Sequence, residues 1–475
     1  MNNINAILDD IRPNRSALFS FFSMMPKGGD LHHHYSGSIY AETYIDYVFK
    51  KDFYINVSTN DIIKDLSKIQ VANLAEWKKI SELSNPDQIK LELLRNWSVK
   101  DFVKGVHSSD EHFFSTFLSF SIPSKDNYVA GLKELKNRAV NQKLNYIETI
   151  FISIDLKSIV VSNEPELDAA LLKIQKDKDE AELNKILDKI FNNYERLLME
   201  AAVTHNDTVK RYHTESNIED ANFKIRYQNY TARFKQPTDV FIEMIACFQS
   251  CALSDLIVGV NIVAAENGET AMRDYWLHMR FFKFLEQKYP TVNYSIHAGE
   301  LVSGMVQPEY LGKHIRQSLI LDNLKRIGHA VDIIYDNDFI NTITKLKQKK
   351  IAIEINLTSN EFILAVSDDM HPVEIYYRNG IPIVICTDDE GVLRTSITEQ
   401  YVLLAHRYKL TYGQIKEVVK NSIVYSNIED ALLKNELLAI LETQFSDFED
   451  VIQKFYSPIV LTKQNVLKFQ NIAFQ

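Results

Sequence analysis

The sequence predicts an α/β protein built on a (β/α)8 TIM barrel with helical insertions. Eight short apolar runs recur along the 475 residues. The spacers between them are mostly long enough for a helix, which is the pattern of parallel strands joined by right-handed crossovers. Histidines and acids gather at the C-terminal ends of the runs, where barrel active sites lie. The predicted strands are 28–35, 145–153, 222–230, 254–263, 291–299, 326–331, 351–359 and 381–389.

The segments outside this alternation are expected to pack around one barrel domain spanning residues 1–475. Residues 1–24 form an N-terminal extension, and residues from about 440 to 475 form a C-terminal one. Residues 36–144 must hold several helices. Residues 164–215 form a helical insertion, because apolar side chains recur there at spacings of three and four. These side chains are Leu183, Ile186, Leu187, Ile190, Tyr194, Leu197, Leu198 and Ala201.

The charge of the chain limits its partners. The formal net charge is −10, and an acidic chain gains no counterion-release energy on nucleic acid. We therefore expect neither nucleic acid nor an anionic membrane surface as a partner. No segment approaches the roughly 20 consecutive apolar residues that span a bilayer. Soluble enzymes are commonly symmetric assemblies, so a homo-oligomer is an expectation from general frequency.

The three cysteines favour a reducing compartment. Cys247, Cys251 and Cys386 are too few and too odd in number for a disulfide framework. The apolar run at residues 17–25 is followed at once by Pro26, Lys27 and Gly28, with no small-residue cleavage site, so it does not match a secretion signal. These features predict a cytoplasmic protein.

The first predicted strand contains three consecutive histidines in the run LHHH. Alternate residues of a strand share a face, so His32 and His34 can point into the barrel while His33 points away. Two imidazoles on one face can reach a single metal at about 2.0–2.1 Å. Taken alone, such a triplet is as typical of a partly exposed loop.

Three later strands end in further candidates. HAGE places His297 at a strand end and Glu300 one short turn beyond, where a desolvated carboxyl group could act as a general acid. RIGHA supplies His329, which alone would more often be structural. TDD supplies Asp388 and Asp389, which point to opposite sides and could equally cap the next helix.

Together these residues form one ring on the barrel rim. Three histidines and one aspartate suit a zinc ion with a position left for water. Zinc lowers the pKa of bound water to about 7 and so generates hydroxide at neutral pH. Residues of these types at so many strand ends predict a hydrolytic metal site.

The ordered motifs LHHH, HAGE, RIGHA, EINLTSN and TDD resemble those of the adenosine deaminase family, within the metal-dependent amidohydrolases. The resemblance runs from residue 25 to residue 391. The MPKGG opening and the long insertions are similar to the adenosine deaminase-related growth factor branch, which is typically secreted, whereas this chain shows no secretion signal.

The resemblance implies a role for each candidate residue. Glu300 would protonate the purine nitrogen beside the reacting carbon, and His329 would accept a proton from zinc-bound water. Asp389 would hydrogen-bond the imidazole side of the purine. Asp388 would take part in catalysis as well as in metal binding, and His34 would also contact the substrate. The implied ligands of one zinc ion per chain are His32, His34, His297 and Asp388.

The chain departs from the family pattern at substrate-facing positions. Ser36 stands where an aspartate normally meets the ribose, and Ala264 stands where a glycine contacts the purine. Asn261 replaces an aspartate, and Glu390 replaces a proline. These departures favour a purine-like ring in general over adenosine in particular. The leading expectation from the resemblance is a zinc-dependent deaminase of adenosine or 2′-deoxyadenosine. The alternatives are a deaminase of adenine, AMP or a methylated adenine nucleotide, and a non-catalytic interaction protein that uses the insertion at 164–215.

Overall fold

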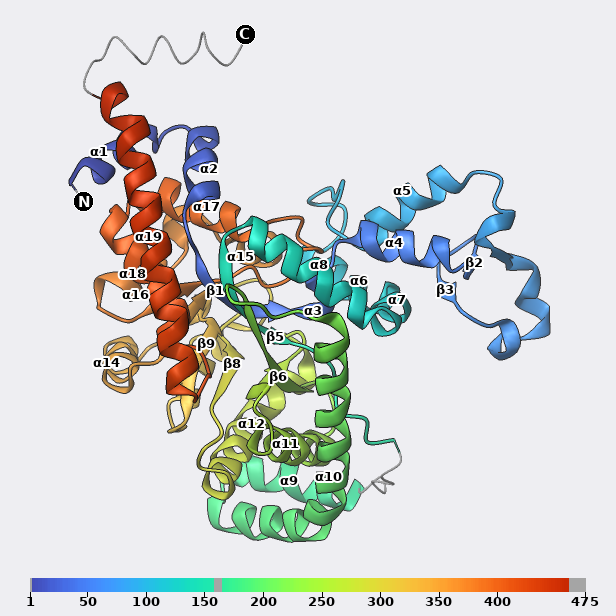
Figure 1. The fold of residues 1–475 in the computed structure, drawn as a ribbon. Helices are drawn as coiled ribbons and strands as arrows, with labels where there is room; N and C mark the ends of the chain where they lie inside the picture. Colours follow the sequence, from blue (N-terminus) through green and yellow to red (C-terminus); the bar gives the residue numbers. More distant parts are fainter. Residues whose placement is uncertain (1, 158–164, 461–475) are drawn as a thin grey trace.

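The barrel predicted from the sequence is present in the structure, a computed structural model that describes residues 2–157 and 165–460. Eight parallel strands form one sheet in the order β1-β5-β6-β7-β8-β9-β10-β11, and helices surround it (Figure 1). Each predicted run overlaps one of these strands. Their bounds are β1 (Gly28–His34), β5 (Leu144–Ile150), β6 (Lys224–Ala232), β7 (Ile257–Val263), β8 (Tyr294–Ala298), β9 (Leu324–His329), β10 (Ala352–Ile355) and β11 (Ile383–Ile385).

The sheet closes on itself between its first and last strands. His33 forms a parallel bridge with Asp388, just beyond β11. The amide of His34 donates to the carbonyl of Asp388 at 3.1 Å, and the amide of Asp388 donates to the carbonyl of His32 at 2.9 Å. The closing seam of the ring therefore runs through the LHHH and TDD motifs.

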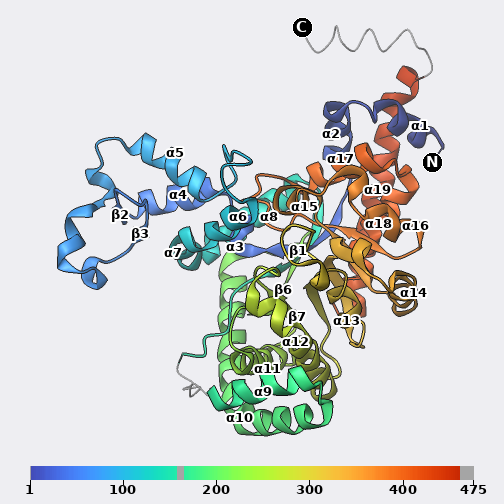
Figure 2. The same ribbon diagram turned by 180° about the vertical axis from the view of Figure 1, so that it is seen from behind.

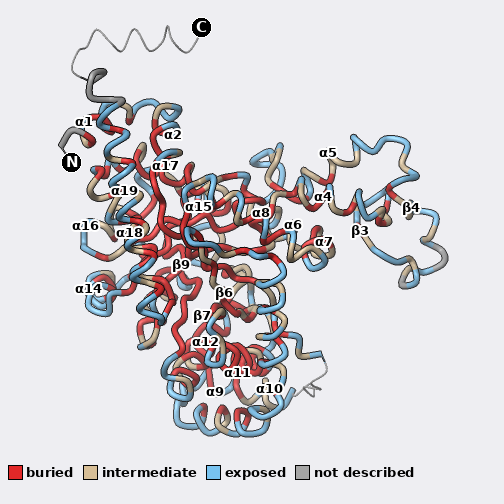
Figure 3. The backbone as a smooth tube through the Cα atoms, viewed as in Figure 1, coloured by how far each residue is buried: buried red, intermediate tan, exposed pale blue. Residues whose placement is uncertain are grey.

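Helices cover the outside of the barrel, and the strands are buried as a result (Figure 3). All seven residues of β5 are buried, for example. The strands of a parallel sheet are buried in this way when helices cover its outer face. The covering helices after β6 are α11 (Pro237–Ala252), α12 (Glu269–Lys288), α13 (His314–Ser318), α14 (Phe339–Lys349), α15 (Leu357–Leu364), α16 (Val373–Arg378), α17 (Ile397–Tyr408) and α18 (Tyr412–Val424).

The two terminal segments pack against each other. Residues 2–24 form α1 (Asn2–Ile11) and α2 (Arg15–Met24), and α19 spans Ala431–Val460. The rings of Phe21 and Phe448 meet edge to face at 5.2 Å between centroids. The apolar end of the predicted C-terminal extension, residues 461–475, lies outside the described residues, as do residues 1 and 158–164.

The predicted insertion contains two helices, α9 (Pro165–Asp177) and α10 (Glu180–Ser216), which pack beside α11 (Figure 1). The predicted apolar stripe of α10 faces inward at Leu183, Leu187, Ile190 and Leu198, which are all buried. Leu197 is an exception, since it is half exposed. Among the described residues, no helix is both long and apolar enough to span a membrane.

The segment 36–144 holds the predicted helices and also a small sheet that the sequence did not predict. Its three antiparallel strands have the order β3-β2-β4, and they project from the barrel with α4 and α5 (Figure 2). Strands of two or three residues have no readable alternation, so their sequence carried no signal. The elements are α3 (Tyr35–Ser38), α4 (Ala41–Lys50), β2 (Tyr54–Asn56), β3 (Ile62–Ile63), β4 (Trp77–Lys79), α5 (Pro86–Asn96), α6 (Ser109–Ser119), α7 (Ser121–Asp126) and α8 (Tyr128–Asn141).

A buried ion network fills the barrel below its C-terminal rim. The guanidinium of Arg326, which is fully buried on β9, lies 2.5 Å from Glu148 of β5 and 2.5 Å from Glu354 of β10. The other oxygen of Glu354 lies 2.6 Å from Nδ1 of His32. The network therefore links the packing of three strands to the orientation of a predicted metal ligand.

Replacing Arg326 by methionine is expected to lower the free energy of unfolding by about 3–5 kcal/mol, because two buried carboxylates would lose their cation. Urea denaturation followed by circular dichroism measures this change. Arg378→Met is the matched control, since Arg378 is exposed and, within the described part of the chain, pairs with Glu374 on the surface of α16; its midpoint should not move. Equal midpoints for the two variants would contradict the prediction.

Candidate metal centre and active site

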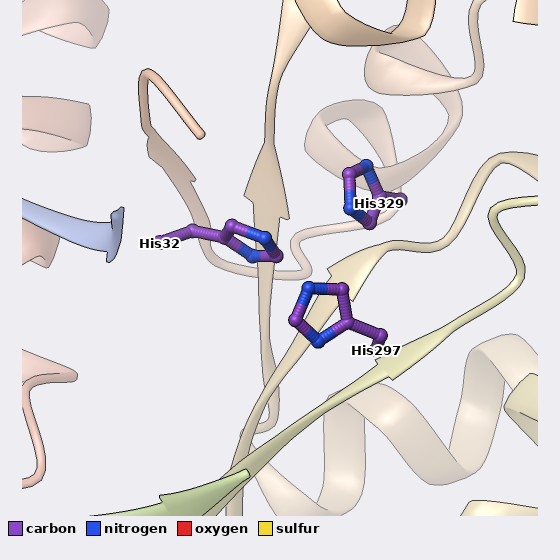
Figure 4. A group of neighbouring side chains, drawn as sticks. All are labelled: His32, His297 and His329. Carbon is purple, nitrogen blue, oxygen red and sulfur yellow. The ribbon is translucent and has the colours of Figure 1, made fainter. Parts of the chain in front are cut away.

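Five predicted side chains meet at the C-terminal rim of the barrel. His32 and His34 come from β1, His297 from β8 and His329 from the end of β9, and Asp388 follows β11. The imidazoles of His32, His297 and His329 point toward one another from separate strands (Figure 4). Overlapping sets of these residues bring their donor atoms within 4.8 Å of one another.

The donor atoms are spaced as one small metal ion requires. Nε2 of His34 lies 3.4 Å from Nε2 of His32 and 3.2 Å from Nε2 of His297. Oδ1 of Asp388 lies 3.4 Å from His32 Nε2 and 3.3 Å from His34 Nε2. Tetrahedral ligands at about 2.0–2.1 Å from zinc are separated by about 3.3–3.4 Å. Three imidazoles and a carboxylate at these spacings therefore fit a zinc-sized ion.

His33, the middle histidine, faces away from this cluster. Its ring is buried, and its Nδ1 lies 2.9 Å from the hydroxyl of Thr149 on β5. The triplet thus divides into two side chains in the cluster and one that packs between strands.

The rings in the cluster are held by side chains behind them, as in many metal sites. Asn261 Oδ1 lies 2.9 Å from Nδ1 of His297. Asn360 Nδ2 lies 2.9 Å from Nδ1 of His329. Glu354 holds His32 in the same way. The sequence analysis gave no role to Asn360 or Glu354. A carboxylate inside the apolar run IAIEI nevertheless indicates a buried charge that requires a hydrogen-bond or ion-pair partner.

A glycine makes room for the His32 ring. A Cβ atom on Gly328 would lie 2.6 Å from Cε1 of His32, closer than nonbonded carbons approach. The glycine of RIGHA is therefore required by the packing of the cluster.

Glu300 and His329 adjoin the cluster. Nε2 of His329 lies 3.6 Å from Oε1 of Glu300 and 3.8 Å from Oδ2 of Asp388. Burial raises the pKa of Glu300 well above its ordinary value, and the charge of Asp388 adds to this effect. Burial lowers the pKa of His329 to about 3, although Asp388 opposes the shift. These shifts favour the protonated form of the Glu300 carboxyl group and the neutral form of the His329 imidazole.

Asp388 and Asp389 differ in their environments, as their alternation along the chain predicted. Burial alone would raise the pKa of Asp388, but His32 and the other imidazoles hold it well below its ordinary range. Burial raises the pKa of Asp389, and the neighbouring charge of Asp388 raises it further. Oδ1 of Asp389 is buried and accepts no hydrogen bond from the described residues.

The residues that depart from the family pattern have different surroundings. Ser36 is half-buried on α3, and its carbonyl accepts a hydrogen bond from Tyr44 at 3.0 Å. Glu390 is buried and accepts from Arg138 at 3.0 Å and from Gln142 at 2.7 Å. Glu390 therefore ties the chain after β11 to α8, which gives this departure a structural reason.

Ala264 follows β7 with φ at +84°, in the left-handed region that favours glycine. Replacing it by glycine is expected to raise the free energy of unfolding by up to about 1 kcal/mol, because an L-residue pays for this backbone conformation. Urea denaturation measures the change. Ala265→Gly is the control, since Ala265 has no positive φ and should lose stability instead. A loss of stability in both variants would contradict the prediction.

A (β/α)8 barrel with histidines and an aspartate converging at its C-terminal rim defines the class of metal-dependent amidohydrolases. A family model described as adenosine deaminase matches residues 206–443, half of the chain. The chain therefore belongs to the adenosine deaminase family, as the motifs predicted.

Individual relatives match shorter stretches. Human N6-methyl-AMP deaminase is 29% identical over 150 residues, 31% of this chain and 40% of its own length. Adenosine deaminase 2 of Dictyostelium discoideum is 28% identical over 176 residues, 37% of this chain and 30% of its own length. The adenosine deaminase of Shewanella halifaxensis is 26% identical over 156 residues, 32% and 46% respectively. The matched part thus spans less than half of each relative.

Solved structures share the fold over most of the chain. The N6-methyl-AMP deaminase of Arabidopsis thaliana superposes with a TM-score of 0.56 at 17% identity, covering 90% of this chain and 99% of that one. An adenine deaminase of Arthrobacter aurescens has a TM-score of 0.55 at 14% identity, covering 89% and 99%. A zinc-containing amidohydrolase of Burkholderia ambifaria has a TM-score of 0.52 at 16% identity, covering 92% and 94%.

Proposed function

We propose that this protein catalyses zinc-dependent hydrolytic deamination of adenosine or 2′-deoxyadenosine, with release of ammonia. The observation that carries the proposal is the convergence of three histidines and Asp388 at metal-ligand spacing, with Glu300 and His329 beside them. Membership of the adenosine deaminase family supports the reaction class.

One metal ion is proposed at the cluster. It is held by His32, His34, His297 and Asp388, whose donor spacings fit a zinc-sized ion. When bound, zinc lowers the pKa of water to about 7 and so makes hydroxide available at neutral pH. Glu354 and Asn261 keep two of the imidazoles oriented for this purpose.

The remaining residues handle protons and the substrate. Glu300 donates a proton to the purine ring nitrogen beside C6, which makes that carbon electrophilic. His329 accepts the proton of the attacking water, and Asn360 holds its ring. Asp389, whose pKa is raised by burial, donates a hydrogen bond from its protonated carboxyl group to the imidazole nitrogen of the purine. Addition of water at C6 and departure of ammonia convert adenosine to inosine.

A second substrate is proposed on specific grounds. Ser36 and Ala264 replace the family residues that meet ribose and purine, and relatives include an N6-methyl-AMP deaminase and an adenine deaminase. The alternative is therefore a free-base or phosphorylated 6-aminopurine in place of the nucleoside. The proposed compartment is the cytoplasm, supported by three buried cysteines that form no disulfide.

The test is amine release by zinc-loaded protein from five compounds: adenosine, 2′-deoxyadenosine, adenine, AMP and N6-methyl-AMP. We expect ammonia from the two nucleosides, no release by His297→Ala, and normal release by His406→Ala, which removes a histidine of α17 outside the cluster. Release from adenine or a nucleotide alone would establish the alternative substrate. No release from any compound would refute the proposed reaction.

A further inference from the structure

We propose that Glu266 is a positioning residue for this reaction, because it fixes the turn that carries Glu300. Glu266 lies three residues beyond β7, and its side chain is fully buried. It does not belong to the groups of side chains whose donor atoms gather at the proposed metal site. The inference rests on the proposed function, in which Glu300 is the proton donor.

Both carboxylate oxygens of Glu266 accept hydrogen bonds from the backbone of the turn after β8. The amide of Gly299 donates to Oε1 at 2.9 Å, and the amide of Glu300 donates to Oε2 at 2.9 Å. Two hydrogen bonds from consecutive amides to one carboxylate fix both the position and the orientation of the backbone at Gly299 and Glu300. Because one of these amides is that of Glu300 itself, the same contact sets the direction in which its side chain leaves the backbone.

The turn needs an external acceptor here. It follows the end of β8, and Gly299 has φ at +82°, so its amide and that of Glu300 have left the strand ladder. The carbonyl of Gly299 accepts from the amides of Val331 and Asp332 at 2.8 and 3.0 Å. The turn is thus held on one side by the chain after β9 and on the other by Glu266.

Glu266 is itself held rigidly. Nδ1 of His314 bonds Oε1, and Nη1 of Arg233 lies 3.8 Å from Oε2. Tyr275 stacks on His314 with ring centroids 3.6 Å apart. Arg233 also donates to the carbonyl of Ile262 at 3.1 Å. Burial alone would raise the pKa of Glu266, but His314, Arg233 and the turn amides lower it to about 2, so the acceptor is a carboxylate.

The first measurement is independent of activity. Hydrogen–deuterium exchange of the peptide that contains residues 299–300 is compared between wild type and Glu266→Gln. The glutamine side chain has one carbonyl oxygen, which accepts hydrogen bonds, and one NH2 group, which only donates. It can therefore replace only one of the two bonds to the turn amides. We expect faster exchange in this peptide, whereas the Glu286→Gln control should leave it unchanged.

Glu286 is a matched control because its carboxylate also accepts hydrogen bonds from two consecutive backbone amides, at the N-terminal end of the barrel. Its Oε2 accepts from the amides of Asp322 and Asn323 at 2.9 and 3.1 Å, just before β9 begins. The N-terminal end of a barrel contributes stability and not chemistry. Glu286→Gln is therefore expected to lower Tm while kcat stays at the wild-type value.

The second measurement separates positioning from stability. Glu266→Gln is expected to lower kcat about 10–100-fold, as loss of a supporting contact commonly does, with KM and bound zinc unchanged. In a Glu300→Gln background the same change should cost no more than about twofold, because Glu266 acts through Glu300. If Glu266→Gln proves insoluble, Glu266→Asp keeps the charge beside Arg233 but is too short to reach both amides.

The exchange and kcat results together distinguish failure of the positioning role from failure of the proposed function. Unchanged exchange at 299–300, or equal kcat losses with and without Glu300, would overturn the positioning role. Faster exchange in a wild-type background that releases no amine from any purine would refute the proposed function and leave Glu266 as the residue that fixes the turn. Faster exchange together with a loss that depends on Glu300 establishes the role.

Discussion

Replacing Glu300 by glutamine is expected to lower kcat for adenosine by about 10²–10⁴-fold, the range that a positioned general acid supplies. Glutamine keeps the size of the side chain and lacks a transferable carboxyl proton. The side chain is buried and does not belong to the proposed ligand set, so the variant should retain its bound zinc. Steady-state kinetics and zinc analysis of the same preparation measure both quantities.

The control for this variant is Glu309→Gln. Glu309 lies on the same loop, nine residues further on, and is exposed, so its replacement should leave kcat and KM at wild-type values. Near-normal turnover by Glu300→Gln would show that another group donates the proton. Loss of zinc from Glu300→Gln would assign Glu300 to the metal site instead.

Replacing His34 by alanine is expected to abolish stable zinc binding and deaminase activity together. His34 is the ligand candidate whose Nε2 lies within 3.2–3.4 Å of both neighbouring imidazoles and Asp388. Loss of an outer partner already weakens metal affinity about 10–100-fold, so loss of a direct ligand should exceed that range. Zinc content after dialysis, measured by mass spectrometry, gives the result.

The adjacent histidine provides the matched comparison. His33→Ala removes an imidazole one residue away that packs against Thr149. It should lower stability and retain about one zinc per chain, as a single four-ligand site predicts. Equal zinc contents in His33→Ala and His34→Ala would contradict the division of the triplet. Retention of zinc by both variants would move the metal site elsewhere.

The sequence allowed prediction of the elements that have long, regular signals. Apolar runs separated by helix-length spacers located all eight barrel strands. Alternation along β1 separated His33 from its neighbours, and the motifs placed Glu300 and His329 near them. Parallel strands bring their C-terminal ends to one rim, so residues that are distant along the chain could be brought together without a structure.

The parts that could not be predicted depend on contacts across the barrel. Arg326, Glu354 and Asn360 act through partners on other strands, and a single sequence gives no pairing information for such contacts. Glu266 lies two residues after Ala264, and its role depends on the amides of Gly299 and Glu300, which are more than 30 residues away along the chain. Glu390 stands where the family has a proline, and the structural reason is its contact with Arg138, which is 252 residues away along the chain.

The closing seam has a consequence for how the protein is made. His32 emerges from the ribosome early and Asp388 late, yet their backbones are hydrogen-bonded to each other. A nascent chain that has not yet reached β11 therefore lacks both the last proposed ligand, Asp388, and the strand that closes the ring. Capture of the proposed metal ion would therefore be a late step in biogenesis. A zinc ion that binds only the closed ring stabilises that ring by mass action. The proposed catalytic ion would therefore also hold the first strand of the barrel against the chain that follows the last strand.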